Sequence, residues 1–425
     1  MYKRHINNHI NKMKNRSQHF NHKTFLKFGI NPVLINENYK YKQHIIRAKN
    51  FNPTQKETIY SVTRNYNKPE GMQMTVIPSE KNYTIETTCN YENVIHNINH
   101  LNESKNYMEK PEVVEEIKKY VDHYKHQVNI KPNILLTRAS VKLLNVNYIF
   151  DNIIGSQLQN NVKFADLCSN PGGFTYTIAK KNMKAHMSSY MISKSGYGFL
   201  NLHRDFFEKL NTTNTSIFHL DDDVCTEAGR IRFVQHTNDQ LMDFVLADGG
   251  IDYSNKENYQ EYYSRELYIS QLLLGSMILK EGGFMLCKMF TLFLNFSVSL
   301  LYVMSFMFET IEIVKPTSSK GANSECYVLF KNYKRSSYIL GYMNDVANRL
   351  VELKTYDLYD INSLINSDSD EYDEFKNNLT KISKDLSIKQ CIELEKFTGK
   401  VKINNKSENS KAFMNCKTWI STFKQ

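Results

Sequence analysis

Short apolar runs alternate with amphipathic stretches through the middle of the chain, over residues 130–335. The runs have the length of buried strands, and the stretches between them have the apolar spacing of helices. This alternation predicts an α/β fold in which helices cover a parallel sheet. The predicted strands are 162–167, 186–192, 216–220, 242–247, 283–288, 309–315 and 326–330; the predicted helices are 137–150, 173–182, 262–280 and 292–307.

The N-terminal part of the chain has a different pattern. Residues 1–25 contain no acidic side chain and are rich in Asn, Lys and His, which predicts a disordered basic tail. A mitochondrial transit peptide is the alternative, whereas the apolar stretch of a secretory signal is missing. Residues 26–129 form an N-terminal extension whose fold the pattern does not predict, apart from an amphipathic helix over 112–125.

The pattern changes again in the C-terminal extension, residues 336–425, which we expect to be mainly helical. Helical spacing extends over 337–365, and the acidic run 367–374 then predicts a solvated loop. The only tryptophan of the chain, Trp419, lies in this extension, where a core position is favoured over a binding role.

One uncharged stretch, residues 289–308, has about the length that a bilayer requires. It follows directly on a predicted strand, where a helix that covers the sheet is expected, and no basic cluster flanks it as a membrane anchor would need. We therefore predict a buried helix and keep a membrane span as the alternative. The polar side chains that interrupt the stretch are Thr291, Asn295, Ser297, Ser299 and Ser305.

The composition limits the class of protein. A chain of 425 residues, 41% of them hydrophobic, can hold one large domain with additions or two to three smaller ones. The 54 Lys and Arg exceed the 44 Asp and Glu by a net charge of +10, which favours a polyanionic partner. The 7 cysteines are scattered and the 13 histidines have no metal-ligand spacing, which argues against a disulfide framework and a metal site.

A glycine turn follows the first predicted strand in Asp166-Leu-Cys-Ser-Asn-Pro-Gly-Gly-Phe174. Open α/β sheets bind nucleotides at the carboxyl ends of their strands, and Gly172 and Gly173 allow the backbone to approach a ligand closely. Neither G-x-G-x-x-G nor a P-loop is present, so a phosphate cradle is not indicated. The turn suits a ligand without phosphates, such as S-adenosylmethionine; a structural turn without a ligand is the alternative.

Two lysines and two acids recur along the chain in the order Lys, Asp, Lys, Glu. Each stands in a distinctive local setting. These settings are Lys142 in Thr137-Arg-Ala-Ser-Val-Lys-Leu143, Asp248 in Leu246-Ala-Asp-Gly-Gly250, Lys288 in Gly282-Gly-Phe-Met-Leu-Cys-Lys-Met-Phe290, and Glu325 in Lys315-Pro-Thr-Ser-Ser-Lys-Gly-Ala-Asn-Ser-Glu325.

Together, the glycine turn and the four charged residues resemble the FtsJ-like ribose 2′-O-methyltransferases, most closely the cap-specific mRNA enzymes. The resemblance covers 130–335 and includes the longer stretches 271–274 and 296–302. It implies a Rossmann-like methyltransferase fold, with a seven-stranded, mostly parallel sheet whose last strand is antiparallel. It also implies methyl transfer from S-adenosylmethionine to a ribose 2′-hydroxyl of RNA, at the first transcribed nucleotide of capped mRNA.

The resemblance also implies roles for the four charged residues. Methyl transfer from a sulfonium is an in-line displacement, and a hydroxyl nucleophile gains from a positioned base. Lys288 is the expected base, Lys142 its electrostatic partner, Asp248 its orienting acid and Glu325 the acid that fixes the lysine geometry. A second lysine lowers the pKa of Lys288 whereas the acids raise it, and the sequence leaves open which effect is larger.

The expected cofactor contacts come from the glycine turn and from acids after two later strands. Many methyltransferases of this fold have an acid at the end of the second strand, but here that strand ends in Lys194. Asp223 is the first candidate to accept from the adenine amino group and Asp221 the second, with a solvated acidic turn as the alternative. The full expected set is Cys168, Ser169, Pro171, Gly172, Gly173, Phe174, Asp221, Asp223 and Asp248.

RNA contacts are expected from polar residues that border the motifs, with ordinary surface charge as the alternative. The sequence does not identify the cap-binding residues; Trp419 and Tyr253 are named as guesses, with a core role favoured for Trp419. The expected partners are capped mRNA and other capping or transcription proteins, in the cytoplasm for a viral chain or the nucleus for a cellular one. An rRNA or tRNA ribose methyltransferase, or a catalytically silent RNA-binding subunit, remains an alternative. The RNA-contact candidates are Arg138, Lys315, Lys320, Asn323 and Ser324.

Overall fold

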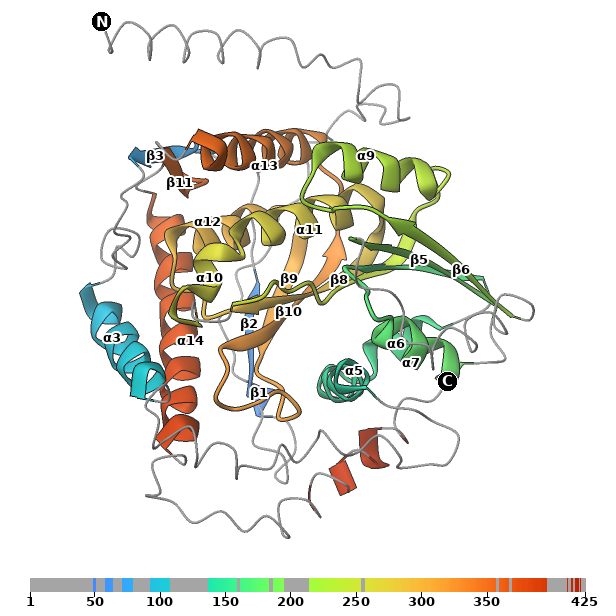
Figure 1. Cartoon of the computed structure of the whole chain (residues 1–425), viewed down its shortest axis with the longest axis horizontal. Coiled ribbons are helices and arrows are strands. Elements are labelled where there is room, and N and C mark those ends of the chain that lie inside the picture. Colours follow the sequence, from blue (N-terminus) through green and yellow to red (C-terminus); the bar gives the residue numbers. More distant parts are fainter. Residues whose placement is uncertain are drawn as a thin grey trace, which may run out of the picture.

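A large β-sheet with helices on both of its faces forms the centre of the protein in a computed structural model (Figure 1). The predicted basic tail and the helix predicted over 112–125 lie outside the residues that the structure describes. The described residues are 49–50, 58–63, 71–78, 92–107, 137–158, 161–182, 186–194, 214–253, 257–356, 359–366, 369–395, 411, 414–415, 417–419 and 421.

The sheet confirms all seven predicted strands and the predicted fold class. In the order β6-β5-β4-β7-β8-β10-β9, the first five strands are parallel to one another, and β10 is antiparallel to both β8 and β9. The chain order reverses between β4 and β7. Sheets of this kind bind ligands at such a reversal, in a crevice at the carboxyl ends of the strands. The bounds are β4 Val162–Leu167, β5 Met187–Ser193, β6 Thr215–Asp221, β7 Met242–Ala247, β8 Leu279–Phe290, β9 Phe308–Val314 and β10 Glu325–Tyr333.

Alternate residues of the central strands face two separate hydrophobic cores. On β7, Val245 and Ala247 face one core, whereas Phe244 and Leu246 face the other. Burial on both faces explains why these strands read as continuous apolar runs. Across the second core, the rings of Phe164, Phe244 and Phe284 stack at 5.1 Å between successive centroids.

The helices divide between these two faces. Helices α5, α6 and α7 cover the face that holds the phenylalanine stack, and α9, α11, α12 and α13 cover the other (Figure 1). The charged helix α9 was not predicted. The bounds are α5 Arg138–Ile149, α6 Ile153–Gln157, α7 Gly173–Lys181, α9 Glu227–His236, η3 Glu257–Tyr259, α10 Gln260–Tyr263, α11 Arg265–Ile278, α12 Asn295–Met304 and α13 Ser337–Tyr356.

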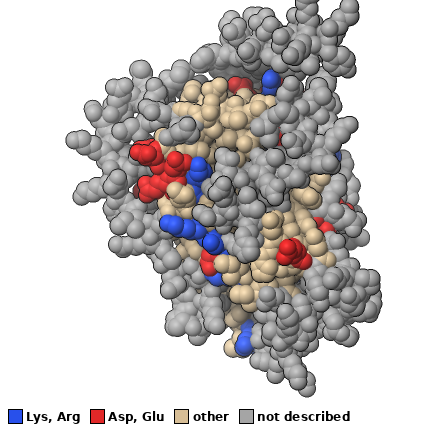
Figure 2. Space-filling view, turned by 90° about the vertical axis from the view of Figure 1, so that its left-hand side faces the viewer, with Lys and Arg blue, Asp and Glu red and all other residues tan. Residues whose placement is uncertain are grey.

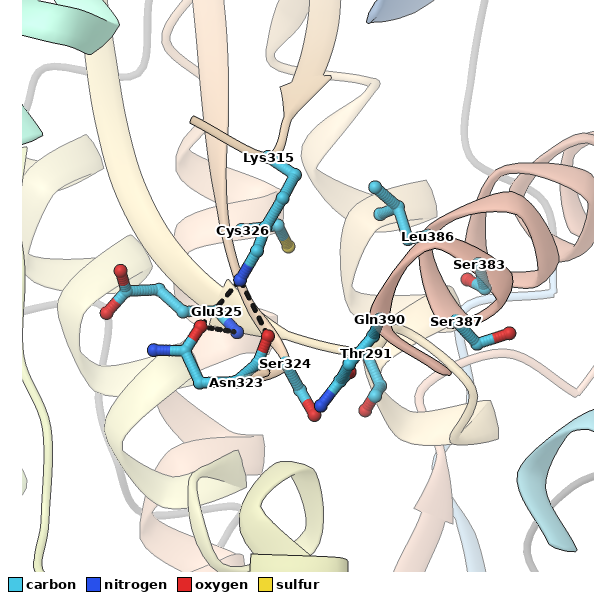
Figure 3. A pocket seen from close by; sticks show the side chains of 10 residues that line it. All are labelled: Thr291, Lys315, Asn323, Ser324, Glu325, Cys326, Ser383, Leu386, Ser387 and Gln390. Carbon is cyan, nitrogen blue, oxygen red and sulfur yellow. Dashed lines mark hydrogen bonds between the residues drawn. The ribbon is translucent and has the colours of Figure 1, made fainter. Parts of the chain in front are cut away.

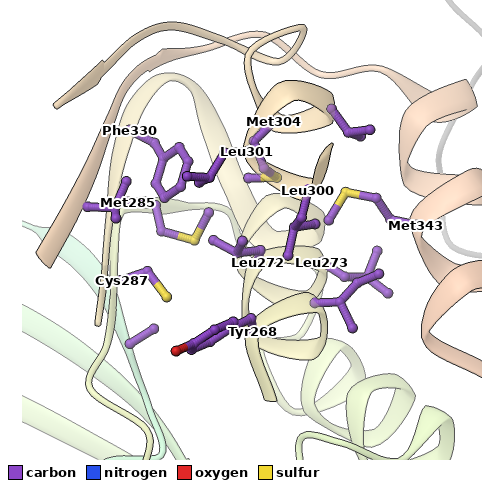
Figure 4. Close-up of a cluster of buried hydrophobic side chains, with 14 of the residues drawn as sticks. Tyr268, Leu272, Leu273, Met285, Cys287, Leu300, Leu301, Met304, Phe330 and Met343 are labelled. Atoms are coloured by element: carbon purple, nitrogen blue, oxygen red, sulfur yellow. The ribbon is translucent and has the colours of Figure 1, made fainter. Parts of the chain in front are cut away.

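The uncharged stretch 289–308 contains α12, all of whose residues are buried. The prediction of a buried helix is therefore confirmed, and no helix among the described residues is long and apolar enough to cross a membrane. Figure 4 shows how α12 meets its neighbours in the core, where the labelled side chains are Tyr268, Leu272, Leu273, Met285, Cys287, Leu300, Leu301, Met304, Phe330 and Met343.

The N-terminal extension adds two strands to the central sheet, and the two extensions together form a second, separate sheet. Strand β2 (Thr58–Thr63) pairs antiparallel with β9, and β1 (Lys49–Asn50) pairs with β2. Strand β3 (Thr75–Pro78) pairs with β11 (Tyr359–Ser363) in a separate two-stranded sheet. The division of the chain at residues 129/130 and 335/336 stays a prediction.

Two predictions for the C-terminal extension were wrong. The helix predicted over 337–365 ends at Tyr356 and strand β11 follows, because β3 supplies a pairing partner. The acidic run predicted to be a loop instead enters helix α14 (Asp370–Glu395), whose first turn contains Asp370, Glu371 and Asp373. Acidic side chains are favourable there because they complement the positive end of the helix dipole.

Helix α14 lies beside α3 (Glu92–Tyr107), so the two extensions contact each other (Figure 1). Trp419 is fully buried against the core on the side of α5 and α7, which confirms its expected core position. Segments from both ends of the chain thus pack on the central α/β unit.

Candidate active site

The four charged residues of the sequence motifs come from four elements that meet at the carboxyl edge of the sheet. Lys142 is on α5, Asp248 directly follows β7, Lys288 is on β8, and Glu325 begins β10. Strand β10 pairs with β8 so that Tyr327 is opposite Lys288. Because alternate residues of a strand share a face, Glu325 and Tyr327 both point toward the lysines.

The charged groups form two ion pairs. Lys142 Nζ donates to Glu325 Oε2 at 2.7 Å. Lys288 Nζ lies 3.2 Å from Asp248 Oδ1 and donates to the Asp248 carbonyl oxygen at 2.8 Å. The side chains are between 5% and 18% exposed. Two positive and two negative groups can share this protected position because their charges compensate one another.

The charges at this site also set the pKa values of Glu325 and Lys288. Burial raises the pKa of Glu325, but Lys142, Lys288 and Lys315 outweigh it and hold this pKa at about 2. For Lys288, burial lowers the pKa, while Asp248 and Glu325 act in the opposite direction and raise it above its ordinary value. The acids therefore have the larger effect on Lys288, a balance that the sequence left open.

Neighbouring residues that were not predicted hold the two acids in place. Tyr327 donates from its hydroxyl to Asp248 Oδ1 at 2.8 Å, and Ser319 donates to Glu325 Oε1 at 2.6 Å. A Cβ atom on Gly250 would stand 3.2 Å from Lys288 Nζ, so the glycine after Asp248 leaves room for the ammonium group. Strand alternation from Glu325 would have indicated Tyr327; nothing in the sequence pattern indicated Ser319.

The glycine turn after β4 faces the same edge of the sheet. Gly172 has φ +89°, which favours glycine. Gly173 has a different role, because a Cβ there would lie 2.6 Å from Thr137 Oγ1, and its carbonyl accepts from Ser140 Oγ at 3.2 Å. Gly172 thus shapes the turn, and Gly173 lets α7 pack against the start of α5.

The strand that leads into this turn ends near a buried acid, Asp166. Its Oδ2 accepts from Thr175 N at 3.1 Å and from Thr175 Oγ1 at 2.8 Å. Burial raises the pKa of Asp166 to about 7 despite these two hydrogen bonds. The contacts fix the start of α7 relative to β4 and thereby hold the turn between them.

A model of the family described as FtsJ-like methyltransferase matches residues 135–333. We call residues 135–333 the FtsJ-like domain, after the family to which they are similar. This FtsJ-like domain includes the four charged residues, the glycine turn and strands β4 to β10. Strands β1 to β3 and helices α3 and α14 lie outside it.

The chain is also similar to curated cap methyltransferases. It is 32% identical over 295 residues to the cap-specific mRNA (nucleoside-2′-O-)-methyltransferase 1 of Drosophila melanogaster, covering 63% of this chain and 36% of that protein. For the Homo sapiens protein of the same name, the identity is 30% over 267 residues, covering 57% and 30%. The chain therefore spans about a third of the length of these relatives.

The solved structures that align with this chain include that of an rRNA methylase from Streptococcus thermophilus. It aligns at 12% sequence identity with a TM-score of 0.29, and the alignment covers 44% of this chain and 95% of that one.

The predicted cofactor residues of the FtsJ-like domain lie in different environments. Phe174 packs in the hydrophobic core, and Ser169 is buried. Cys168 has φ +59°, and its Sγ lies 3.1 Å from where a Cβ on Gly249 would be. The glycine turn therefore meets the Asp-Gly-Gly segment, where Gly249 N also donates to Gln271 Oε1 at 3.0 Å.

The acids after β6 are only in part available to a ligand. Asp223 accepts from Cys225 N and from Lys194 Nζ, each at 3.0 Å. Burial opposes the charge of Asp223, but these two donors lower its pKa below the ordinary value. Asp221 is exposed at the end of its strand. Lys194 thus occupies the strand end where many methyltransferases have an acid, and pairs with Asp223.

Among the predicted RNA contacts, Lys315 is directed inward. Its Nζ donates to Asn323 O at 2.6 Å and to Asn323 Oδ1 at 2.5 Å, and burial lowers its pKa to about 8. A phosphate contact would require Lys315 to release Asn323. Lys320 is exposed, whereas Ser324 is buried. On the face shown in Figure 2, basic side chains lie in small groups beside acidic ones among the described residues.

A small pocket, most of whose lining residues are polar, adjoins Glu325 on its far side (Figure 3). Both the FtsJ-like domain and helix α14 contribute to its walls, so the C-terminal extension reaches the back of the candidate active site. The lining residues are Thr291, Lys315, Asn323, Ser324, Glu325, Cys326, Ser383, Leu386, Ser387 and Gln390.

Proposed function

We propose that this chain transfers a methyl group from S-adenosylmethionine to the ribose 2′-hydroxyl of the first transcribed nucleotide of capped mRNA. The observation that carries this proposal is the meeting of the pairs Lys142–Glu325 and Lys288–Asp248 beside the glycine turn. The names of the relatives support the cap as the target, and the FtsJ-like domain supports methyl transfer.

The residues present fit S-adenosylmethionine. The turn approaches Gly249 so closely that a Cβ there would fill the space beside Cys168 and Gln271. Asp248 and Asp223 supply carboxylates around this crevice, which suit a cationic, phosphate-free ligand. When bound, S-adenosylmethionine supplies an activated methyl group on a sulfonium.

Each charged residue then has a defined task in the proposed reaction. Lys142 would hold the 2′-oxygen, and Lys288, as the neutral amine, would accept the hydroxyl proton on Nζ while the bond from the 2′-oxygen to the transferred methyl group forms and the bond from that methyl group to the sulfonium sulfur breaks. Asp248 orients Lys288 and Glu325 orients Lys142, through the ion pairs described above. Accurate placement of the oxygen supplies much of the rate enhancement, since the displacement is in line.

Capped and uncapped transcripts of one sequence provide the decisive assay. With methyl-labelled S-adenosylmethionine, we expect label in the capped transcript and a much lower level in the uncapped one. Digestion should locate the label on the first transcribed ribose. Equal labelling of both transcripts would contradict the cap as target and leave ribose methylation standing. Failure to label any RNA would contradict the enzyme itself and favour a silent RNA-binding subunit.

The proposed substrate also suggests where the protein acts and with what. Capped transcripts are found in the nucleus and cytoplasm, so we propose a nuclear location for a cellular chain and a cytoplasmic one for a viral chain. Other capping or transcription proteins are the proposed partners, because they make the capped end that this reaction modifies.

A further inference from the structure

Helix α14 contacts the loop that carries Glu325. Gln390, which is 4% exposed, donates from Nε2 to the Ala322 carbonyl oxygen at 2.8 Å. Seven residues earlier on the same helix, Ser383 donates to the Leu292 carbonyl oxygen at 2.8 Å. The first contact holds the loop between β9 and β10, and the second holds the loop that follows the Lys288 strand.

The contacting residues of α14 lie on one face of the helix. Ser383, Ser387 and Gln390 follow one another at the spacing of a helical face, and all three line the pocket behind Glu325 (Figure 3). Both loops that border the catalytic ion pairs are therefore supported by a single rigid element.

The loop is held tightly against α14 and against itself. A Cβ atom on Gly321 would lie 2.5 Å from Cγ of Glu393, so the Glu393 side chain would have to shift to make room for a larger residue. Within the loop, Lys315 donates to Asn323, and Ser319 donates to Glu325. Movement at the α14 contact is therefore transmitted through a short, hydrogen-bonded loop to the Glu325 carboxylate.

A small apolar cluster fixes α14 in this position. Its buried members come from α3, from α14 and from the loop after β8, with Ala322 packed against them. Because α3 and α14 lie outside residues 135–333, the FtsJ-like domain alone lacks this support. The buried members are Leu101, Phe293, Leu294, Cys391 and Leu394.

We propose that α14 positions Glu325 for methyl transfer and that Gln390 is the positioning residue through which it acts. The inference rests on the proposed function, since it assigns the C-terminal extension to the same reaction. Gln390 fixes the loop that leads directly into Glu325, the residue that pairs with Lys142. A misplacement of about 1 Å at such a site can cost roughly 10²-fold in rate.

Gln390→Leu tests this role, because leucine keeps an apolar stem but cannot donate to Ala322. We expect kcat to fall at least tenfold, with the Kd for S-adenosylmethionine within about twofold of the wild-type value, since the glycine turn is untouched. Ile388→Gln on the exposed face of α14 is the matched control, and its kcat should equal that of the wild type.

The pH dependence of kcat separates positioning from a general loss of structure. Lys288 is faced by Asp248, Glu325, Tyr253 and Cys168. Glu325 raises the pKa of Lys288, so displacement of Glu325 lowers it, and the rise of kcat with pH should move to lower pH in Gln390→Leu. A merely weakened fold would reduce kcat without moving this midpoint.

A second pair of variants tests the contact between α14 and the loop by changing the loop residue Gly321. Gly321→Ala should lower kcat because its methyl group meets Glu393, and Glu393→Ala in the same chain should restore kcat by removing Cγ. Wild-type kcat in both Gln390→Leu and Gly321→Ala would overturn the inference. So would a loss of kcat with an unmoved pH midpoint and weakened cofactor binding. An inactive wild-type protein would instead contradict the proposed function.

Discussion

Lys288 is under opposing electrostatic influences that bear directly on its proposed role. Burial favours the neutral amine, but Asp248 and Glu325 raise the pKa of Lys288 above its ordinary value. At neutral pH, Lys288 is therefore an ammonium group in the ligand-free protein. A second positive charge nearby makes the ammonium less favourable, so a cationic ligand would shift Lys288 toward the base that the reaction needs.

Lys288→Ala removes the proposed base, and we expect the rate of methyl transfer to fall by about 10²–10⁴-fold. The Kd for S-adenosylmethionine should stay close to the wild-type value, because the glycine turn and its hydrogen bonds remain. Single-turnover kinetics and calorimetric titration measure the two quantities separately.

Lys280→Ala is the control for this variant, because Lys280 lies on the same strand, is 62% exposed and pairs only at the surface with Asp243. Its rate should match that of the wild type. A Lys288→Ala protein with the wild-type rate would remove the base assignment, whatever its effect on cofactor binding.

Asp166 gives a prediction about stability. Burial raises its pKa in the folded protein to about 7, above the ordinary value of 3.8, so the neutral carboxyl stabilises the fold at low pH. This stability is lost as the pH rises through about 7. Asp166→Asn keeps an acceptor for Thr175 and cannot ionise, so its free energy of unfolding should fall less than that of the wild type as the pH rises.

Chemical denaturation at about pH 5 and pH 8 measures this difference, which should amount to a few kcal/mol. Asp239→Asn, at an exposed turn, is the control and should follow the wild type. An equal loss of stability in Asp166→Asn and the wild type would show that Asp166 ionises without cost in the fold.

At the scale of elements, the central strands could be predicted because a strand that is buried on both faces is a continuous run of apolar residues in the sequence. Strands β4 and β7 begin and end where the apolar runs do. Strands β2, β3 and β11 could not be predicted, because each depends on a partner that is distant in the sequence. Helix α14 was partly mistaken for a loop because its first turn is acidic.

The same distinction applies to the candidate site. The charged residues have distinctive local settings, so Lys142, Asp248, Lys288 and Glu325 could be named from the sequence. The residues that support them, such as Tyr327, act through contacts that form only in the fold. Lys315 illustrates the reverse case, because a lysine beside a motif suggests a phosphate contact, whereas the fold turns it toward Asn323.

At the scale of the whole molecule, the two extensions meet on one side of the FtsJ-like domain. Helix α3 packs against α14, and Lys105 of α3 donates to the Glu257 carbonyl oxygen at 3.0 Å. Residues from both ends of the chain thus support segments that follow Asp248 and Lys288. Loss of either extension would therefore affect the site as well as the surface.

The net charge of +10 makes a further prediction about RNA binding. Phosphate contacts release counterions, so affinity for a polyanion falls as salt rises. We expect the Kd for a capped RNA to increase at least tenfold between about 50 and 200 mM salt. Fluorescence anisotropy measures this, with S-adenosylmethionine as the control ligand, whose Kd should change little. RNA binding that is insensitive to salt would show that the excess of Lys and Arg lies away from the RNA, and that base and cap contacts supply the affinity.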